Sequence, residues 1–406
     1  STSACWAMRS RVRAGMGLLF ALCILIAALP AFAAPRIGVM TMQPGEVFWE
    51  RFGHDAIIVD DPARGGAVSY NFGFFDMAEP DFVQNFVRGR MRYALVALPL
   101  EQDLEIYRQE GRGVRVQWLD LTDAQADSLA AALEENALPE NARYQYDYFL
   151  DNCATRVRDA LDRALDGQLG PQLAGRSQGN TYRSEAARLS RPARWMWLAF
   201  ELGLGPNADQ PLSRWQEAFI PMRLADALGE AKTSAGTPLV IAEEELLPHR
   251  LGPEPEARPQ PLLGWTFAGI MIGVFLWFVG RRRPRIAAAF AWVFWALCGL
   301  VGALMLYLWL GSAHWAGWRN HGMLLMNPLA WLLLPGAWAM LRGGIPSRRF
   351  GWLLRIVVGI AVLALPLSWL GIDLQRNGMW IGLLLPIHLA LAALWAGRRR
   401  DATMRG

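Results

Sequence analysis

The sequence predicts two unlike parts, an α+β domain over residues 34–247 and an all-α bundle of five membrane spans over residues 262–397. Hydrophobic residues make up 53% of the 406-residue chain, and they gather in long blocks after Pro261. Apolar residues gathered in this way are typical of a membrane protein with a separate soluble part. A mixed polar region precedes the blocks, and an apolar leader precedes that region.

The N-terminus has the composition of a secretory signal peptide. Met8 is followed by three arginines, an apolar run over residues 16–29 and the small-residue site Ala31-Phe32-Ala33. This order predicts a signal peptide over residues 8–33. An uncleaved anchor is the alternative, and in either case the next segment is exported.

Five apolar runs make up the membrane half, at residues 262–280, 286–310, 323–341, 352–370 and 379–397. Each is long enough to cross an apolar layer of about 30 Å. Arginine clusters follow the first, third and fifth runs, and the positive-inside rule places them in the cytoplasm. The linker at 248–261 and the domain before it then lie in the periplasm, and residues 398–406 form a cytoplasmic tail. We expect a multi-pass protein of the bacterial inner membrane.

Two features of the membrane half allow a functional and a structural interpretation. The polar, aromatic loop at 312–321 could contact lipid headgroups or a lipidated substrate, but we favour an interfacial anchor. His388 lies inside the last apolar run, where a histidine is a functional candidate by default. We favour a structural role for it.

The exported part alternates strand and helix signals. Strands are expected at 56–61, 67–75, 91–98 and 114–119, and the first two are joined by a turn at 61–66. Helices are expected near 80–88, between the third and fourth strands, from a capping box at 122–125 to about 136, and from Cys153 until Gly167 stops it.

Charge and motifs exclude several classes of function. The net charge of +4 comes with arginines at the ends of apolar runs, so nucleic-acid binding is not expected. The exported part holds two histidines and one cysteine without ligand spacing, so no metal site is expected either. We expect no cofactor.

Cys153 is the one cysteine of the exported part, since Cys5 and Cys23 lie in the leader and Cys298 in an apolar run. A single cysteine cannot form an intramolecular disulfide, so it is either an inert buried residue or a working thiol. Asn152 or Asp151 can cap the helix that starts at Cys153. A helix N-terminus favours thiolate, so we expect a thiol pKa below the free value of about 8.5.

A cysteine nucleophile needs a base, and the exported part offers His54 and His249. His249 lies on the linker, whereas His54 opens a predicted strand. A papain-like core places the cysteine at a helix N-terminus and the histidine on the adjacent sheet, and here the histidine comes first, as in a circular permutation. Asn71 is our choice to orient the imidazole. Asp55 and Asp147 are the alternatives.

Five segments carry a family resemblance. They are Phe52-Gly53-His54-Asp55-Ala56-Ile57, Tyr70-Asn71-Phe72-Gly73, the block from Tyr146 to Arg156 with Asp151-Asn152-Cys153 at its centre, Asn180-Thr181-Tyr182-Arg183, and Phe219-Ile220-Pro221. They resemble the Lnb N-terminal periplasmic domain family over about residues 36–247. The membrane half is similar in layout only.

The resemblance implies a permuted papain-like, NlpC-like domain whose Cys153 carries an acyl group and whose His54 is the base. We assign Asn152, Asp151, Tyr146 and Arg156 to substrate or oxyanion contacts. The implied enzyme is a cysteine acyltransferase with a phospholipid as acyl donor and a diacylated lipoprotein as acceptor. The alternatives are an NlpC-type cell-wall endopeptidase and a non-enzymatic membrane scaffold or receptor.

The arginine bias generates a prediction about topology. Alkaline phosphatase fused to the C-terminus should be inactive, because that end lies in the cytoplasm, and a fluorescent protein fused there should fluoresce. A phosphatase fused after residue 250 serves as the active control. Full phosphatase activity at the C-terminus would exclude this topology.

Overall fold

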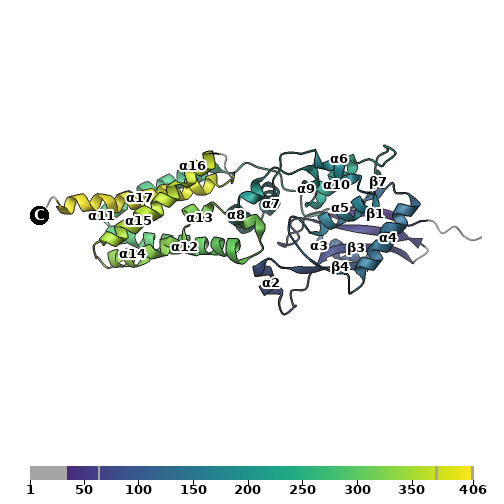
Figure 1. Ribbon diagram of the computed structural model, residues 1–406, viewed down its shortest axis with the longest axis horizontal. Helices are drawn as coiled ribbons and strands as arrows, with labels where there is room; N and C mark the ends of the chain where they lie inside the picture. The colour runs from purple at the N-terminus through teal and green to yellow at the C-terminus, as the bar shows by residue number, and fades with distance from the viewer. Residues whose placement is uncertain (1–33, 63–64, 371–373, 404–406) are drawn as a thin grey trace, which may run out of the picture.

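The computed structural model describes residues 34–62, 65–370 and 374–403, so the predicted signal peptide over residues 8–33 lies outside it. The molecule is elongated, with an α+β domain at one end and a helical bundle at the other (Figure 1). The predicted combination of an α+β domain with a bundle of apolar helices is confirmed.

The domain is built on one antiparallel sheet of seven strands in the order β6-β4-β3-β2-β1-β5-β7. The strands are β1 (Arg36–Met42), β2 (His54–Asp61), β3 (Gly66–Phe74), β4 (Arg92–Pro99), β5 (Val114–Leu119), β6 (Arg143–Gln145) and β7 (Val240–Leu247). The predicted strands at 56–61, 67–75, 91–98 and 114–119 correspond to β2 to β5 within two residues. Strands β1, β6 and β7 were not predicted from the sequence.

Helices cover both faces of the sheet. Because side chains alternate along a strand, Ile57 and Val59 of β2 pack on one face with α4 (Asp123–Ala137) and α5 (Cys153–Ala164). Ala56 and Ile58 pack on the other face with α3 (Leu100–Glu110). The central strand β2 is therefore apolar on both sides, and it carries His54 at its first residue.

The rest of the domain is helical. It consists of α2 (Phe82–Arg88), α6 (Leu169–Ala174), α7 (Tyr182–Ser190), α8 (Arg194–Gly203), η2 (Pro206–Asp209), α9 (Arg214–Glu217) and α10 (Pro221–Glu230). In Figure 1, α7 and α8 lie between the sheet and the bundle.

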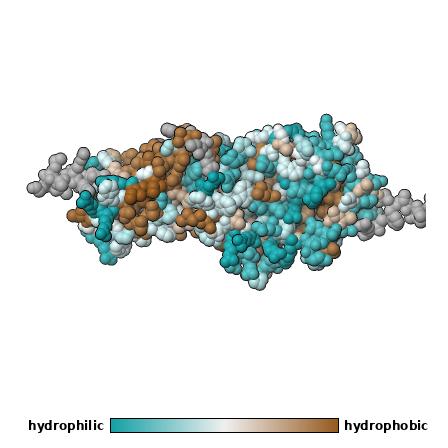
Figure 2. Space-filling model, in the orientation of Figure 1, coloured by the Kyte–Doolittle hydropathy of each residue, from teal (hydrophilic) through white to brown (hydrophobic). Residues whose placement is uncertain are grey.

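The bundle contains five stretches that are long and apolar enough to cross a membrane, as the sequence predicts. They are α11 (Leu262–Arg282), α12 (Pro284–Gly311), the broken span Gly322–Leu341, the span Arg348–Ser368 and the first part of α17 (Gly378–Thr403). The third comprises α13 (Gly322–Leu325), η4 (Pro328–Leu333) and α14 (Leu334–Leu341), and the fourth comprises α15 (Arg348–Val362) and most of α16 (Ala364–Trp369). Hydrophobic residues gather on the bundle surface, and hydrophilic residues on the domain (Figure 2).

Helices α11 and α17 pack closely because glycines meet between them. A Cβ added to Gly269 would lie 2.3 Å from the carbonyl oxygen of Gly382, so no larger residue fits without a shift of the backbone. Small residues at such contacts are common in membrane bundles, where close approach replaces the hydrophobic effect as the driving force.

The loop after α12 packs on the α+β domain, a contact that neither sequence interpretation of residues 312–321 anticipated. Gly205 donates its N–H to the carbonyl of Ala316 at 2.7 Å, and Trp315 packs edge-on against Phe149 and Tyr182. Buried Asn320 donates to the carbonyls of Leu202 and Leu204. The domain and the outer end of the bundle thus share one core and one hydrogen-bond network.

Candidate active site

Cys153 is the first residue of α5, as the sequence predicts, and Asn152 is its cap. The Asn152 side chain accepts from the N–H of Thr155 at 3.0 Å, and Thr155 Oγ1 accepts from the N–H of Asn152 at 2.7 Å. The Asn152 amide also donates to the carbonyls of Tyr148 and Phe219. Asn152 was assigned to substrate or oxyanion contact, and its side chain is engaged within the protein.

The thiol of Cys153 lies where α5 meets the ends of β2 and β3. A Cβ placed on Gly73, which has a left-handed φ of 97°, would lie 3.8 Å from the Cβ of Cys153 and 3.9 Å from the Tyr144 hydroxyl. The backbone N–H of Asp55, one peptide bond from His54, makes a hydrogen bond that favours the thiolate of Cys153. Cys153 and His54 both remain partly exposed, so a substrate can approach them.

Burial raises the pKa of the Cys153 thiol to about 12, and the nearby Asp55 carboxylate acts in the same direction. The N–H groups of Asp55, Ala154 and Cys153 lower this pKa, but by less. The expected thiol pKa below about 8.5 is therefore wrong for this state. Desolvation of the thiolate outweighs the helix N-terminus, because burial penalises the charged form.

His54 and Asn71 are brought together as the sequence predicts, with Nε2 of His54 at 3.1 Å from Oδ1 of Asn71. The Asn71 amide nitrogen donates to Asp103 at 2.8 Å and to Ser69 at 3.2 Å, which fixes the orientation of the amide. Since an amide oxygen only accepts, Nε2 of His54 carries the proton. Its Nδ1 is then the basic nitrogen.

Asp103 is a member of this network that sequence reasoning missed. It is buried on α3, and it also accepts a 2.6 Å bond from Ser69. A signal was available, because Leu100, Asp103, Leu104 and Tyr107 follow the i, i+3, i+4, i+7 spacing of a buried helix face. A carboxylate in that stripe indicates a buried polar contact.

Burial lowers the pKa of His54 to about 4. The Arg112 guanidinium lowers it further, and the Asp103 carboxylate opposes this change. The imidazole is therefore neutral at pH 7 and can accept a proton. These two shifts describe a resting state in which the Cys153 thiol and the His54 imidazole are both neutral.

The two alternatives to Asn71 are engaged elsewhere. Asp55 accepts a 2.8 Å bond from Thr41, and its other oxygen has no hydrogen-bond partner among the described residues. Asp147 accepts from two backbone N–H groups and from Nε1 of Trp315 at 2.8 Å. Asp147 therefore ties the segment before Cys153 to the loop that follows α12.

The remaining predicted site residues fall into two groups. Asp151 and Arg156 form a bidentate pair at 2.5 and 2.8 Å, and the guanidinium of Arg156 lies 4.0 Å above the ring of Tyr144. Tyr146 lies beside Gly73 and packs against Tyr93 with 4.3 Å between ring centroids. The buried Tyr144 hydroxyl, which sequence reasoning missed, has no partner among the described residues. No group of three metal-binding side chains occurs in the described part of the chain.

An aromatic series leads from the thiol to the surface. Tyr93 stacks on Phe75 at 5.0 Å, and Phe75 contacts Trp49 and Phe82. Around this series the surface is apolar, with exposed side chains at Phe48, Trp49, Phe74, Met77, Val83, Phe86 and Val87. Two hydrogen bonds join the C-terminal end of α2 to the loop after α12. The Arg88 carbonyl accepts from the N–H of Ala313, and the Phe86 carbonyl accepts from Nε2 of His314. This apolar surface therefore adjoins the outer end of the bundle.

The family model of the Lnb N-terminal periplasmic domain matches residues 32–185. The match confirms the resemblance predicted from the sequence, and its range includes Cys153, His54 and Asn71. No curated protein and no solved structure gives a significant match to the chain. The matched family and the five apolar helices fit a membrane protein with a periplasmic domain.

Asp55 provides a test of the electrostatics beside the thiol. Burial raises the pKa of Asp55 from 3.8 to about 7. Below pH 3.8 the carboxyl is neutral in both the folded and the unfolded protein, so it costs no stability. As the pH rises from 3.8 towards 7, the unfolded protein loses this proton first, and the folded protein loses stability. The loss amounts to at most about 4 kcal/mol, at 1.36 kcal/mol per pKa unit, and Asp55→Asn removes it because an amide does not ionise. The substitution itself costs about 1–3 kcal/mol at every pH, because the buried amide is left without a full set of partners. In detergent, the variant's unfolding temperature relative to wild type should rise between pH 4 and pH 8.

The control is Asp127→Asn on the exposed face of α4, which should show no such trend. His54 changes stability in the opposite sense, because its lowered pKa makes stability rise with pH between about 4 and 6.5. Since both proteins keep His54, its contribution cancels in the comparison. A difference that stays flat with pH would refute a buried, ionising Asp55.

Proposed function

We propose that the protein is a membrane-anchored cysteine acyltransferase of the bacterial inner membrane. Cys153 takes an acyl chain from a phospholipid and passes it, as a thioester, to the N-terminal amine of a diacylated lipoprotein. Its domain has a permuted papain-like arrangement, in which the histidine strand precedes the cysteine helix.

One observation carries this proposal. The sulfur at the N-terminus of α5 meets the backbone of β2 at Asp55, next to His54. The His54 imidazole is held by Asn71, whose amide is oriented in turn by Asp103. A nucleophile, a base and a group that orients the base are the parts that covalent catalysis requires. The family match over residues 32–185 supports the same assignment.

The chemistry starts from a neutral pair. As the sulfur attacks the ester carbonyl of the phospholipid, Nδ1 of His54 takes the thiol proton, so that no free thiolate accumulates. The S–C bond forms, the ester C–O bond breaks, and the proton passes to the leaving alcohol, which gives a lysophospholipid. The lipoprotein amine then attacks the thioester carbonyl. The C–N bond of the amide forms as the C–S bond breaks, and the amine proton passes through His54 to the sulfur.

Oxyanion stabilisation is available at the same point. The backbone N–H groups of Asp55 and Ala154 already act on the sulfur, and hydrogen-bond donors fixed in a dry site stabilise developing charge well. The unpaired Tyr144 hydroxyl adds a side-chain donor beside Gly73. We assign Tyr144 to the tetrahedral intermediate.

The surface around the site favours a lipid over a cell-wall peptide. Val83, Phe86 and Val87 lie at helical spacing on one face of α2, and all three are exposed. An exposed apolar helix face beside membrane spans is suited to lipid chains. An NlpC-type endopeptidase would use the same thiol, but its peptide substrate would not require an exposed apolar face on α2. A non-enzymatic scaffold would not require His54 as a base.

The first prediction from this proposal concerns a covalent intermediate. Purified full-length protein in phospholipid vesicles should gain the mass of one acyl chain, and hydroxylamine should remove it because thioesters are labile to that nucleophile. Cys153→Ser should abolish the hydroxylamine-sensitive adduct. His54→Ala should fold and slow its formation by about 10²-fold or more, the usual scale for loss of a general base. Intact-mass spectrometry measures both.

Cys298→Ser is the matched control, because Cys298 is buried in the bundle and should leave the adduct unchanged. Protein that never gains this mass but cleaves peptidoglycan stem peptides is the endopeptidase. Protein that does neither, with a Cys153→Ser variant that has no phenotype, is the scaffold.

The second prediction concerns Tyr144. Tyr144→Phe keeps the ring under the Arg156 guanidinium and removes the unpaired hydroxyl. Acyl transfer should slow by about 10²-fold, the lower end for loss of one oxyanion donor. Tyr148→Phe is the control, because that ring is partly exposed and stacks on His314. Equal rates for Tyr144→Phe and wild type would remove Tyr144 from the mechanism.

A further inference from the structure

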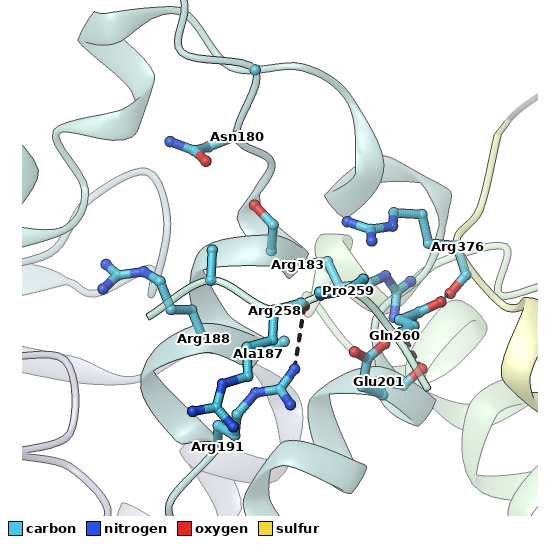
Figure 3. Close-up of a pocket in the computed structure, with 13 residues that line it drawn as sticks. Asn180, Arg183, Ala187, Arg188, Arg191, Glu201, Arg258, Pro259, Gln260 and Arg376 are labelled. Atoms are coloured by element: carbon cyan, nitrogen blue, oxygen red, sulfur yellow. Dashed lines mark hydrogen bonds between the residues drawn. The ribbon is translucent and has the colours of Figure 1, made fainter. Parts of the chain in front are cut away.

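A cavity of about 280 Å³ lies where the domain meets the ends of α11 and α17, and neither Cys153 nor His54 lines it. Figure 3 shows the side chains that line the cavity. Residues of α7 line one side, and the linker from Ala257 to Gln260 together with Arg376 lines the other. The linker ends at α11, which starts at Leu262, and Arg376 precedes α17, which starts at Gly378. The cavity therefore lies at the end of α11 and α17 that the predicted topology places outside the cytoplasm.

The walls of the cavity are held by buried polar bonds. Arg183 is almost fully buried, and its Nε donates to both carboxylate oxygens of Asp209 at 2.9 and 3.0 Å. Asp209 also accepts from the backbone N–H of Arg376 at 3.0 Å. Gln260 donates to the Glu201 carboxylate and to the Arg376 carbonyl. These bonds join α7, η2, α8, the linker and the start of α17.

The charge facing the cavity is positive. Five arginines and one glutamate line it. Arg183 is neutralised by Asp209, and Arg188 by Glu185. Arg191, Arg258 and Arg376 form no ion pair with any carboxylate in the described part of the chain.

Glu201 is the one carboxylate that lines the cavity, and it balances little of this positive charge. Glu201 is buried, and burial raises its pKa, so it offsets at most one of the three remaining charges. The Nε of Arg191 is buried without a hydrogen-bond partner among the described residues, although another of its nitrogens donates to the Arg258 carbonyl at 3.3 Å. The Arg191 guanidinium also lies over the Trp197 ring, so its charge is held at the cavity wall without a carboxylate partner in the described part of the protein.

We propose that this cavity binds the phosphate of an anionic glycerophospholipid headgroup in the outer leaflet. Arginine forks match phosphate oxygens, and charge-assisted hydrogen bonds of this kind are strong. Leu262, Leu263 and Phe267 are exposed on α11 directly after the linker. They continue the site into the apolar layer, where the acyl chains of a bound lipid would lie. A free phosphate has no acyl chains and would make no contact with these apolar side chains.

This inference does not depend on acyl transfer, because it concerns binding and needs no turnover. The test uses full-length protein in detergent micelles and follows its unfolding temperature as ligand is added. The probes are short-chain phosphatidylglycerol, short-chain phosphatidylcholine, glycerol phosphate and inorganic phosphate. Ligands that bind the folded form raise the unfolding temperature with their concentration. Phosphatidylglycerol should bind most tightly, and the two soluble phosphates at least about tenfold more weakly.

The double variant Arg258→Gln with Arg376→Gln should weaken phosphatidylglycerol binding by about tenfold or more, since one charge-assisted bond is worth about 1.5–3 kcal/mol. Its control is Arg163→Gln with Arg250→Gln, which removes two exposed arginines outside the cavity and should change binding by less than about twofold. Arg376→Gln alone serves if the double variant does not fold.

Two results would overturn the proposal. If the cavity variants bind phosphatidylglycerol as wild type does, the arginines do not form the site. If inorganic phosphate or glycerol phosphate matches the lipid in affinity, and the variants lose both equally, the ligand is a water-soluble phosphate and the lipid assignment is wrong.

Discussion

The side chain of Asn152 is the contact on which the rest of the site depends. It caps α5, so it decides where the helix begins and therefore that Cys153 is in its first turn. The same amide reaches the carbonyls of Tyr148 and Phe219, and it thereby holds the aromatic segment on one side and the approach to α10 on the other. A capping residue that only ended a helix would fix one element. Asn152 fixes three elements, namely the start of α5, the segment at Tyr148 and the segment at Phe219. Together these contacts set the position of the Cys153 sulfur against β2.

Burial then decides the electrostatic state of the site. The helix N-terminus and three backbone N–H groups favour a thiolate, yet enclosure by protein shifts the thiol further towards its neutral form. The same enclosure keeps His54 neutral, although Asp103 lies behind Asn71. Cys153 and His54 therefore carry no separated charges in this structure. A neutral thiol reacts more slowly with oxidants than a thiolate does, so this state protects Cys153 from oxidation.

Features with a periodic or local signal could be predicted from the sequence. The five spans follow from hydropathy, β2 to β5 from alternation, and the start of α5 from the cap at Asn152. Asn71 was chosen over Asp55 and Asp147 because it lies on the strand after His54. In the sheet Asn71 pairs with Ala56, two residues from His54, so both side chains point to the same face. The rest depends on contacts between distant residues. Asp103 is polar in an apolar stripe, and its partner lies on another element. The pKa of Cys153 depends on burial, and the docking of residues 312–321 on a surface that exists after folding.

The contact between Trp315 and the domain has a consequence for how this protein can be handled. Trp315 and Ala316 belong to the same apolar cluster as Phe149, Tyr182 and Phe219, and Trp315 bonds to Asp147, six residues before Cys153. A soluble fragment cut at residue 247 would lose this cover and present several aromatic rings to water. It would also free Asp147 and the segment that leads to the thiol. The loop between two spans therefore belongs to the architecture of the extracytoplasmic domain, and the unit of folding crosses the boundary that the sequence draws between a soluble part and a membrane part.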